Sequence, residues 1–188
     1  SFSKAAKKQL QKIADALSSG GSFDNVDGGI ATCISPDYQG PTLKPVMTKV
    51  FDDEAISVHQ SQSKDPVIAT YMGRDGFQES LAQFANQIGG SSEGNLRTKI
   101  KIIRIEKSEE TTMTRALFET TSSMPGKTLQ QTFTWNCSWT TTADNSSPLL
   151  SAVVISSFEE VTYQSALPGF IKATNSLMGN EDSFREQM

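Results

Sequence analysis

A long run of alternating residues in the second half of the chain limits the fold more than any other feature. Within residues 128–139, one face of an extended strand would carry Leu129, Gln131, Phe133, Trp135, Cys137 and Trp139. The intervening positions are all polar. A period of two is typical of a β-strand with one buried face. The face with both tryptophans is either core or subunit interface, which aromatic residues favour, or the wall of a ligand pocket.

The same period persists on both sides of this stretch and predicts four long strands joined by short polar turns. They span about residues 97–107, 111–122, 128–142 and 149–163. In the first strand the apolar phase slips, which indicates a β-bulge between Ile102 and Ile103. The middle of the fourth strand is apolar on both faces, so we expect it to be central in the sheet and covered on both sides.

Two helices are predicted in the first half of the chain. Apolar residues at steps of three and four indicate a helix over about residues 3–18, which Gly20 and Gly21 end. The same spacing indicates a second helix that begins at the N-cap residue Asp75 and ends before Gly89.

The segments around these helices are less regular. Residues 22–45 are rich in Gly and Pro, which predicts a long irregular connection with one short element around 30–34. Short strands are expected at about 46–51 or 55–60, and at about 67–72.

Composition argues against two classes of partner. The chain has 188 residues, which suits one domain, and its formal net charge is -4. Nucleic-acid surfaces need clustered Lys and Arg, whereas the one basic cluster lies along the first helix and is interpreted as a solvated face; its members are Lys4, Lys7, Lys8 and Lys12. No stretch has the roughly eighteen apolar residues of a membrane span. We therefore expect no nucleic acid and no membrane span.

The residues that usually carry metal or cofactor chemistry are few. Cys33 and Cys137 do not have the spacing of a metal site or a redox motif, and they are either a disulfide or two buried thiols. His59 is the one histidine, so neither a Ser-His-Asp order nor a zinc ligand set can be found. No glycine-rich phosphate loop precedes a helix. We therefore expect no metal and no cofactor.

The order of elements, together with the segments "DGFQESLAQFANQI", "TKIKIIRIEK" and "TLQQTFTWNCSWTTT", resembles the nuclear transport factor 2-like superfamily. This superfamily includes the SnoaL-like polyketide cyclases and the ketosteroid isomerases, and the resemblance covers the chain to about Tyr163. It implies an α+β fold of the cystatin-like kind: a curved antiparallel sheet of four long strands plus a short hairpin, wrapped around the N-terminal helices as a cone. It also implies a mouth for a small hydrophobic ligand and a homodimer formed through the outer face of the sheet.

A second resemblance concerns the end of the chain. The segments "LPGFIKATNSLMGNEDSFREQM" and "LKPVMTKVFDDEAISVHQ" resemble the N-terminal region that precedes FG-GAP-like repeats in large exported proteins of planctomycete-type bacteria. This implies a module of a larger protein that is periplasmic or extracellular, with a cytoplasmic location as the alternative. Residues 1–165 then form the domain. Residues 166–188 form an extension, either a docking helix or the start of a linker to a downstream region.

Candidate site residues follow from the first resemblance. Catalytic members use an Asp or a His–Asp pair inside the cone as general acid or base, and the residues available here are His59 with an acid such as Asp53. At a strand end next to polar residues, His59 also fits a solvated or structural role. Arg115 shares a strand face with Glu119, either in a pocket or on the outer face. A ligand pocket or interface is expected to involve Tyr71, Phe133, Trp135, Cys137, Trp139 and Arg115.

Two functions are consistent with these expectations. The first is a non-catalytic module that binds a small hydrophobic ligand or assembles with itself, as part of a larger exported protein. The second is a SnoaL-like isomerase, cyclase or dehydratase that acts on a small hydrophobic substrate by general acid–base catalysis. The two differ in whether His59 and a carboxylate point into the cone.

Overall fold

The computed structural model describes residues 1–61, 71–89, 96–108, 111–141 and 147–164. The predicted extension 166–188 and most of the predicted strand 67–72 lie outside these residues. In chain order the elements are helix α1 (Phe2–Ser18), the short 3₁₀ helix η1 (Ile30–Thr32), strands β1 (Ile34–Gly40), β2 (Met47–Asp52), β3 (Ile56–Ser61) and β4 (Tyr71–Met72), helix α2 (Gly73–Gln87), and strands β5 (Leu96–Lys107), β6 (Thr112–Met124), β7 (Lys127–Thr140) and β8 (Leu149–Gln164).

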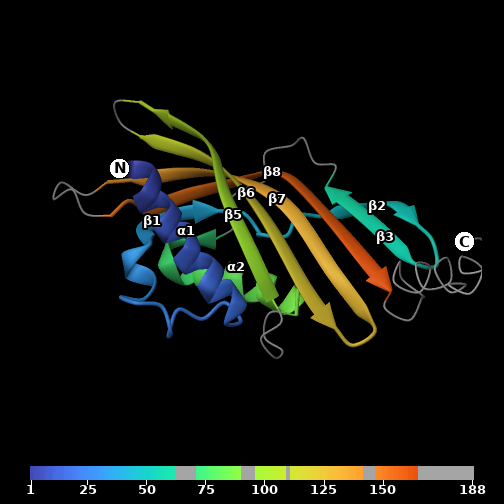
Figure 1. Cartoon of the computed structure of the whole chain (residues 1–188). Helices are drawn as coiled ribbons and strands as arrows, with labels where there is room; N and C mark the ends of the chain where they lie inside the picture. Colours follow the sequence, from blue (N-terminus) through green and yellow to red (C-terminus); the bar gives the residue numbers. More distant parts are fainter. Residues whose placement is uncertain (62–70, 90–95, 109–110, 142–146, 165–188) are drawn as a thin grey trace, which may run out of the picture.

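The strands of the described part form one curved sheet in the order β2-β3-β8-β7-β6-β5. The four long strands are antiparallel neighbours, as predicted, and the hairpin β2–β3 pairs with the other edge of β8. β1 also pairs with β8, in parallel, and β4 pairs with β1. Both helices lie on one side of the sheet, and the hairpin extends past them at the far end (Figure 1). The predicted fold class, a curved antiparallel sheet wrapped around N-terminal helices, is confirmed.

The sheet face toward the helices, called the concave face from here on, carries the core. Phe133 is fully buried and stacks on Phe118 and Phe158, with ring centroids 5.0 and 5.1 Å apart. From α2, Phe84 packs edge-on against Phe133 at 5.6 Å. Burial of such side chains contributes about 1.5–3 kcal/mol each. The apolar face of β7 is therefore close-packed between sheet and helices.

Of two expectations about strand geometry, the structure confirms one and contradicts the other. The predicted bulge in β5 is confirmed, because the pairing with β6 shifts register between Ile102 and Arg104. β8 is central, as predicted, but its coverage on both sides is wrong: Val154 is 54 % exposed. The register of β8 against β7 shifts at Trp135 and again at Trp139. Extra residues on β8 therefore move its apolar side chains from one face to the other, which accounts for the mixed pattern.

The irregular segments contain more structure than their composition indicates. β1 lies within the predicted irregular stretch 22–45 and is held by pairing with β8 and β4. Asp75 is not the N-cap of α2, since Met72 occupies that position and Asp75 falls in the first turn. A carboxylate there still interacts favourably with the positive end of the helix dipole.

Candidate functional site

A row of polar side chains crosses the concave face next to the stacked phenylalanines. Directly paired residues on antiparallel strands point to the same face of a sheet. The strand register therefore places six residues side by side, one from each of β2, β3, β8, β7, β6 and β5. This set, called the polar row, consists of Lys49, His59, Glu160, Gln131, Thr120 and Thr98.

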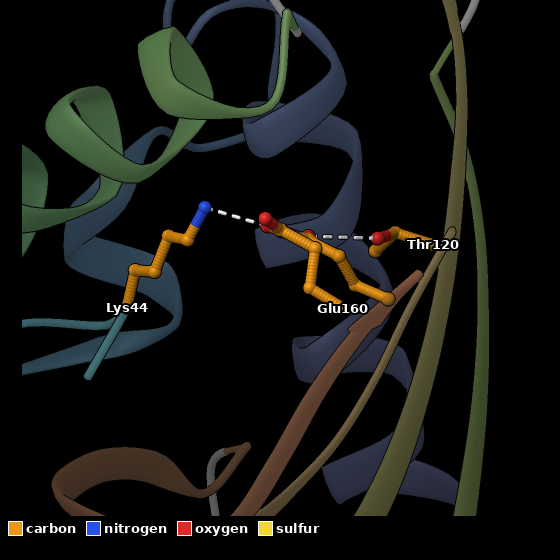
Figure 2. Close-up of polar contacts among 4 residues, drawn as sticks. Lys44, Thr120 and Glu160 are labelled. Atoms are coloured by element: carbon orange, nitrogen blue, oxygen red, sulfur yellow. Dashed lines mark hydrogen bonds and ion pairs between the residues drawn. The ribbon is translucent and has the colours of Figure 1, made fainter. Parts of the chain in front are cut away.

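Hydrogen bonds connect the middle of the polar row. Thr120 Oγ1 donates to Gln131 Oε1 at 3.1 Å, and Gln131 Nε2 donates to Glu160 Oε2 at 2.7 Å. Lys44, in the connection between β1 and β2, reaches the same oxygen with its Nζ at 2.5 Å. Figure 2 shows Lys44 approaching Glu160 from the opposite side to the strand that carries Thr120. Lys44 and Gln131 thus hold the carboxylate of Glu160, and Thr120 in turn holds the amide of Gln131.

The carboxylate of Glu160 is well shielded from water. Its side chain is 12 % exposed and that of Lys44 is 20 % exposed. A carboxylate in such a place is stable only when it is paired and hydrogen-bonded, and the ammonium and amide donors provide this. Both donors contact Oε2, and no residue in the described ranges donates to Oε1.

Two members of the polar row have buried polar atoms without partners. His59 Nδ1 and Thr98 Oγ1 are inaccessible to water and have no hydrogen-bond partner among the described residues. Leaving such an atom unpaired costs about 1–3 kcal/mol, and each case in a native structure calls for an explanation such as a ligand or a buried water. They lie on either side of the bonded set of Glu160, Gln131 and Thr120. The polar row is thus satisfied at its centre and unsatisfied on both sides.

Asp53 and His59 are not brought together as an acid–base pair. Asp53 Oδ1 accepts hydrogen bonds from the backbone amides of Ala55 and Ile56, at 2.8 and 2.7 Å, and so closes the turn between β2 and β3. His59 lies three residues further along β3, about 10 Å from Ile56 at the usual rise of a strand. The carboxylate directly opposite His59 is that of Glu160, on β8. No hydrogen bond joins these two side chains.

The residues expected to line a pocket or interface lie in three different places. Phe133, Trp135, Cys137 and Trp139 are at most 1 % exposed and belong to the core. Tyr71 is on β4, where its hydroxyl donates to Gln83 Oε1 at 2.7 Å. Arg115 is exposed on the outer face, opposite Arg104 and Asn136 on the adjacent strands, beside a hollow of about 150 Å³.

The two cysteines are buried free thiols rather than a disulfide. Burial raises the pKa of Cys137 to about 12 and that of Cys33 to about 11. Both are therefore protonated near neutral pH and have little nucleophilic character. Within the described ranges no three His, Cys, Asp or Glu side chains group as a metal site, and no helix is long and apolar enough to cross a membrane.

Comparison with known proteins gives likenesses of structure. No protein-family model matches the chain, and no curated protein does. The chain is similar to the Kfla4162 protein from Kribbella flavida, with a TM-score of 0.52 and 10% identity over 82% of this chain and 88% of that one. At this identity the likeness concerns the fold alone.

Two further structures have lower scores. One is described as "Rd1NTF2_04 with long sheet" (TM-score 0.39, 10% identity, covering 79% of this chain and 96% of that chain). The other is described as "Rd1NTF2_05 with long sheet" (TM-score 0.38, 12% identity, covering 79% and 93%). TM-scores this low do not establish a shared fold. The observed sheet and helices are themselves consistent with the nuclear transport factor 2-like cone that the sequence predicts.

Proposed function

We propose that the protein binds a small, mostly apolar molecule on its concave face, with the polar row as the recognition element. The observation that carries this proposal is the state of Glu160. Its carboxylate is held through Oε2 by Lys44 and Gln131, while Oε1 has no donor from the described residues. Next to it, His59 has a buried nitrogen without a partner. A fixed acceptor beside an unpaired ring nitrogen is the kind of convergent polar group that orients a ligand.

The surroundings of the polar row limit the chemistry of the ligand. The neighbouring concave residues Phe158 and Leu129 are apolar and almost fully buried, so the polar row borders the apolar part of the sheet. One hydroxyl group can donate to Glu160 Oε1 and also exchange a hydrogen bond with His59. The best fit is therefore a ring system with one hydroxyl or enol group.

A pair of adjacent glutamates provides a sharp test. Glu160 is on the concave face, whereas Glu159 is on the outer face and accepts from Gln60 Nε2 at 2.6 Å. With 2-naphthol as the probe, ¹H–¹⁵N NMR shifts should report saturable binding at the Gln131 side-chain amide. A hydrogen bond to a charged acceptor contributes about 1.5–3 kcal/mol, so Glu160→Gln should weaken binding by about tenfold or more. Glu159→Gln should leave it within about twofold.

The outcomes distinguish binding at the polar row from non-specific binding elsewhere on the protein. Equal weakening by both substitutions, or shifts confined to the outer face, would show that the polar row does not bind the probe. Thermal melting followed by circular dichroism checks that Glu160→Gln, which leaves the Lys44 ammonium without its partner, still folds.

Acid–base catalysis of the SnoaL-like kind is the second candidate, and one observation favours it. His59 and Glu160 face each other across paired strands, so a base and an acid share one side of the sheet. The Glu160 carboxylate can remove a proton from a carbon next to a carbonyl while a protonated His59 donates its proton to the carbonyl oxygen. The pair replaces the combination of His59 with Asp53, whose carboxylate is used by the turn.

Deuterium exchange tests this candidate without knowledge of the natural substrate. 2-Tetralone in D₂O exchanges its acidic carbon-bound protons, and NMR measures the rate above the buffer background. Catalysis predicts acceleration by the native protein, its loss in His59→Ala and Glu160→Gln, and no change in Glu159→Gln. An identical rate in His59→Ala would remove the histidine from any catalytic role.

Assembly through the outer face remains part of the proposal. Its support is the exposure of apolar side chains there, among them Val154 at 54 % and Met113 at 41 %. Such side chains on an open sheet face are typical of interfaces. Sedimentation equilibrium should give a dimer in the micromolar range, and a strict monomer would contradict it. Membership in a larger exported protein stays a prediction.

A further inference from the structure

A hollow of about 400 Å³ lies between α1, η1 and the start of β8. It is lined by Lys8, Gln9, Lys12, Ala31, Thr32, Ser147 and Leu149. Among the described residues, this lining contains two ammonium groups and no carboxylate. The volume is within the range of small-molecule sites. The hollow therefore has the size and the charge of a site for an anion.

The floor of the hollow is held in place by a buried amide. Gln9 is 2 % exposed, and its Nε2 donates to the carbonyl oxygens of Thr32 and Pro148 at 2.6 and 3.1 Å. These two bonds tie α1 to η1 and to the residue that precedes β8. Lys8 and Lys12, which lie on either side of Gln9 in the sequence, thus belong to a helix whose position is fixed by these bonds.

The two lysines are in different states. Lys12 Nζ donates to Asp27 O at 2.8 Å and to Thr32 Oγ1 at 2.9 Å, which fixes its position. The third donor of the ammonium group has no acceptor among the described residues. Lys8 has no ion pair or hydrogen bond within the described ranges. The basic cluster of α1 is accordingly not a uniform solvated face, because Lys12 is half-buried while Lys4, Lys7 and Lys8 are exposed.

The spacing of the lysines also needs an explanation. Lys8 and Lys12 are four residues apart on one helix, where like charges repel and destabilise the helix. A divalent oxyanion between them would reverse this repulsion and would accept charge-assisted hydrogen bonds from both.

We propose that this hollow binds the phosphate group of a small phosphorylated molecule, at a site separate from the polar row. Phosphate offers acceptor oxygens to the remaining Lys12 donor, the Lys8 ammonium and the Ser147 hydroxyl group. The hollow is larger than a phosphate group alone and so has room for part of the molecule that carries it.

The experiment compares neighbouring lysines on the same helix. Inorganic phosphate and glycerol 3-phosphate are titrated at constant ionic strength into the native protein, Lys8→Gln and the control Lys7→Gln, which removes the same charge outside the hollow. Backbone amide shifts of Thr32 and Leu149 report binding. Loss of one charge-assisted contact should weaken binding by about fivefold or more in Lys8→Gln, with Lys7→Gln close to native and glycerol 3-phosphate tighter than phosphate.

Three results would overturn the proposal. One is equal weakening in Lys7→Gln and Lys8→Gln, which would mean that the diffuse charge of α1 attracts anions. Another is the absence of saturation by either ligand. The third is saturable binding with shifts confined to the polar row. Lys8 is exposed and has no hydrogen bond or ion pair with the described residues, so Lys8→Gln should fold like the native protein.

Discussion

Replacing Phe133 with alanine tests whether the apolar face of β7 is a packed core or a lined space. The side chain is fully buried, stacks between the rings of Phe118 and Phe158, and meets Phe84 edge-on. Phe→Ala in a core costs about 3–5 kcal/mol. The three ring contacts just named each add about 0.5–1.5 kcal/mol to the effect of buried apolar area, so the loss should lie at the upper end of this range. We expect the free energy of unfolding to fall by about 4–5 kcal/mol.

Urea unfolding followed by tryptophan fluorescence and circular dichroism measures this loss. For a domain of this size the midpoint of thermal unfolding should fall by about 2–4 °C per kcal/mol. Gln130→Ala, at the neighbouring exposed position on the outer face, is the control and should stay within about 0.5 kcal/mol. If Phe133→Ala costs less than about 2 kcal/mol, the low end of core truncations, then the aromatic layer is not close-packed and the pocket interpretation of β7 gains support.

Two further predictions concern backbone strain and alkaline pH. Gly21 has a φ of +87°, and a Cβ there would lie 2.4 Å from Ala82 Cα in α2. Gly21→Ala should therefore lower the free energy of unfolding in urea by about 3 kcal/mol or more. The control Gly126→Ala, with a φ of +78° and open space around the added Cβ, should cost only the backbone strain of about 1 kcal/mol. Burial raises the pKa of the Cys137 thiol from 9.0 to about 12, so this thiol ionises at lower pH in the unfolded chain than in the folded protein. The free energy of unfolding is therefore unaffected by this group below pH 9. It falls by about 1.4 kcal/mol per pH unit as the pH rises from 9 towards 12. Cys137→Ala should make the decline of unfolding free energy between pH 9 and 10.5 shallower, and an unchanged slope would mean that the thiol is not buried.

The parts of the fold that local periodicity controls were predictable. The four long strands, the bulge in β5 and helix α1 follow from which residues alternate or recur along a few turns. β1 was not predictable in this way, because Ile34 and Gln39 are held by residues of β8 from the other end of the chain. The exposure of Val154 was missed for a related reason: register shifts belong to a pair of strands and cannot be assigned from one strand alone.

The candidate site shows the same division between what one strand encodes and what pairing adds. His59 was a visible candidate, but its carboxylate neighbour depends on β3 pairing with β8, which brings Glu160 opposite it, while the nearer acid in sequence, Asp53, closes a turn. One local signal did point to the site. Between Leu129 and Trp139, Gln131 is the single polar residue in the apolar phase of β7, and a buried amide must find partners. Its partners are Thr120 and Glu160 on the two flanking strands. A lone amide within a strict apolar alternation therefore marks where polar side chains from neighbouring strands converge, even when the sequence does not reveal which strands they are.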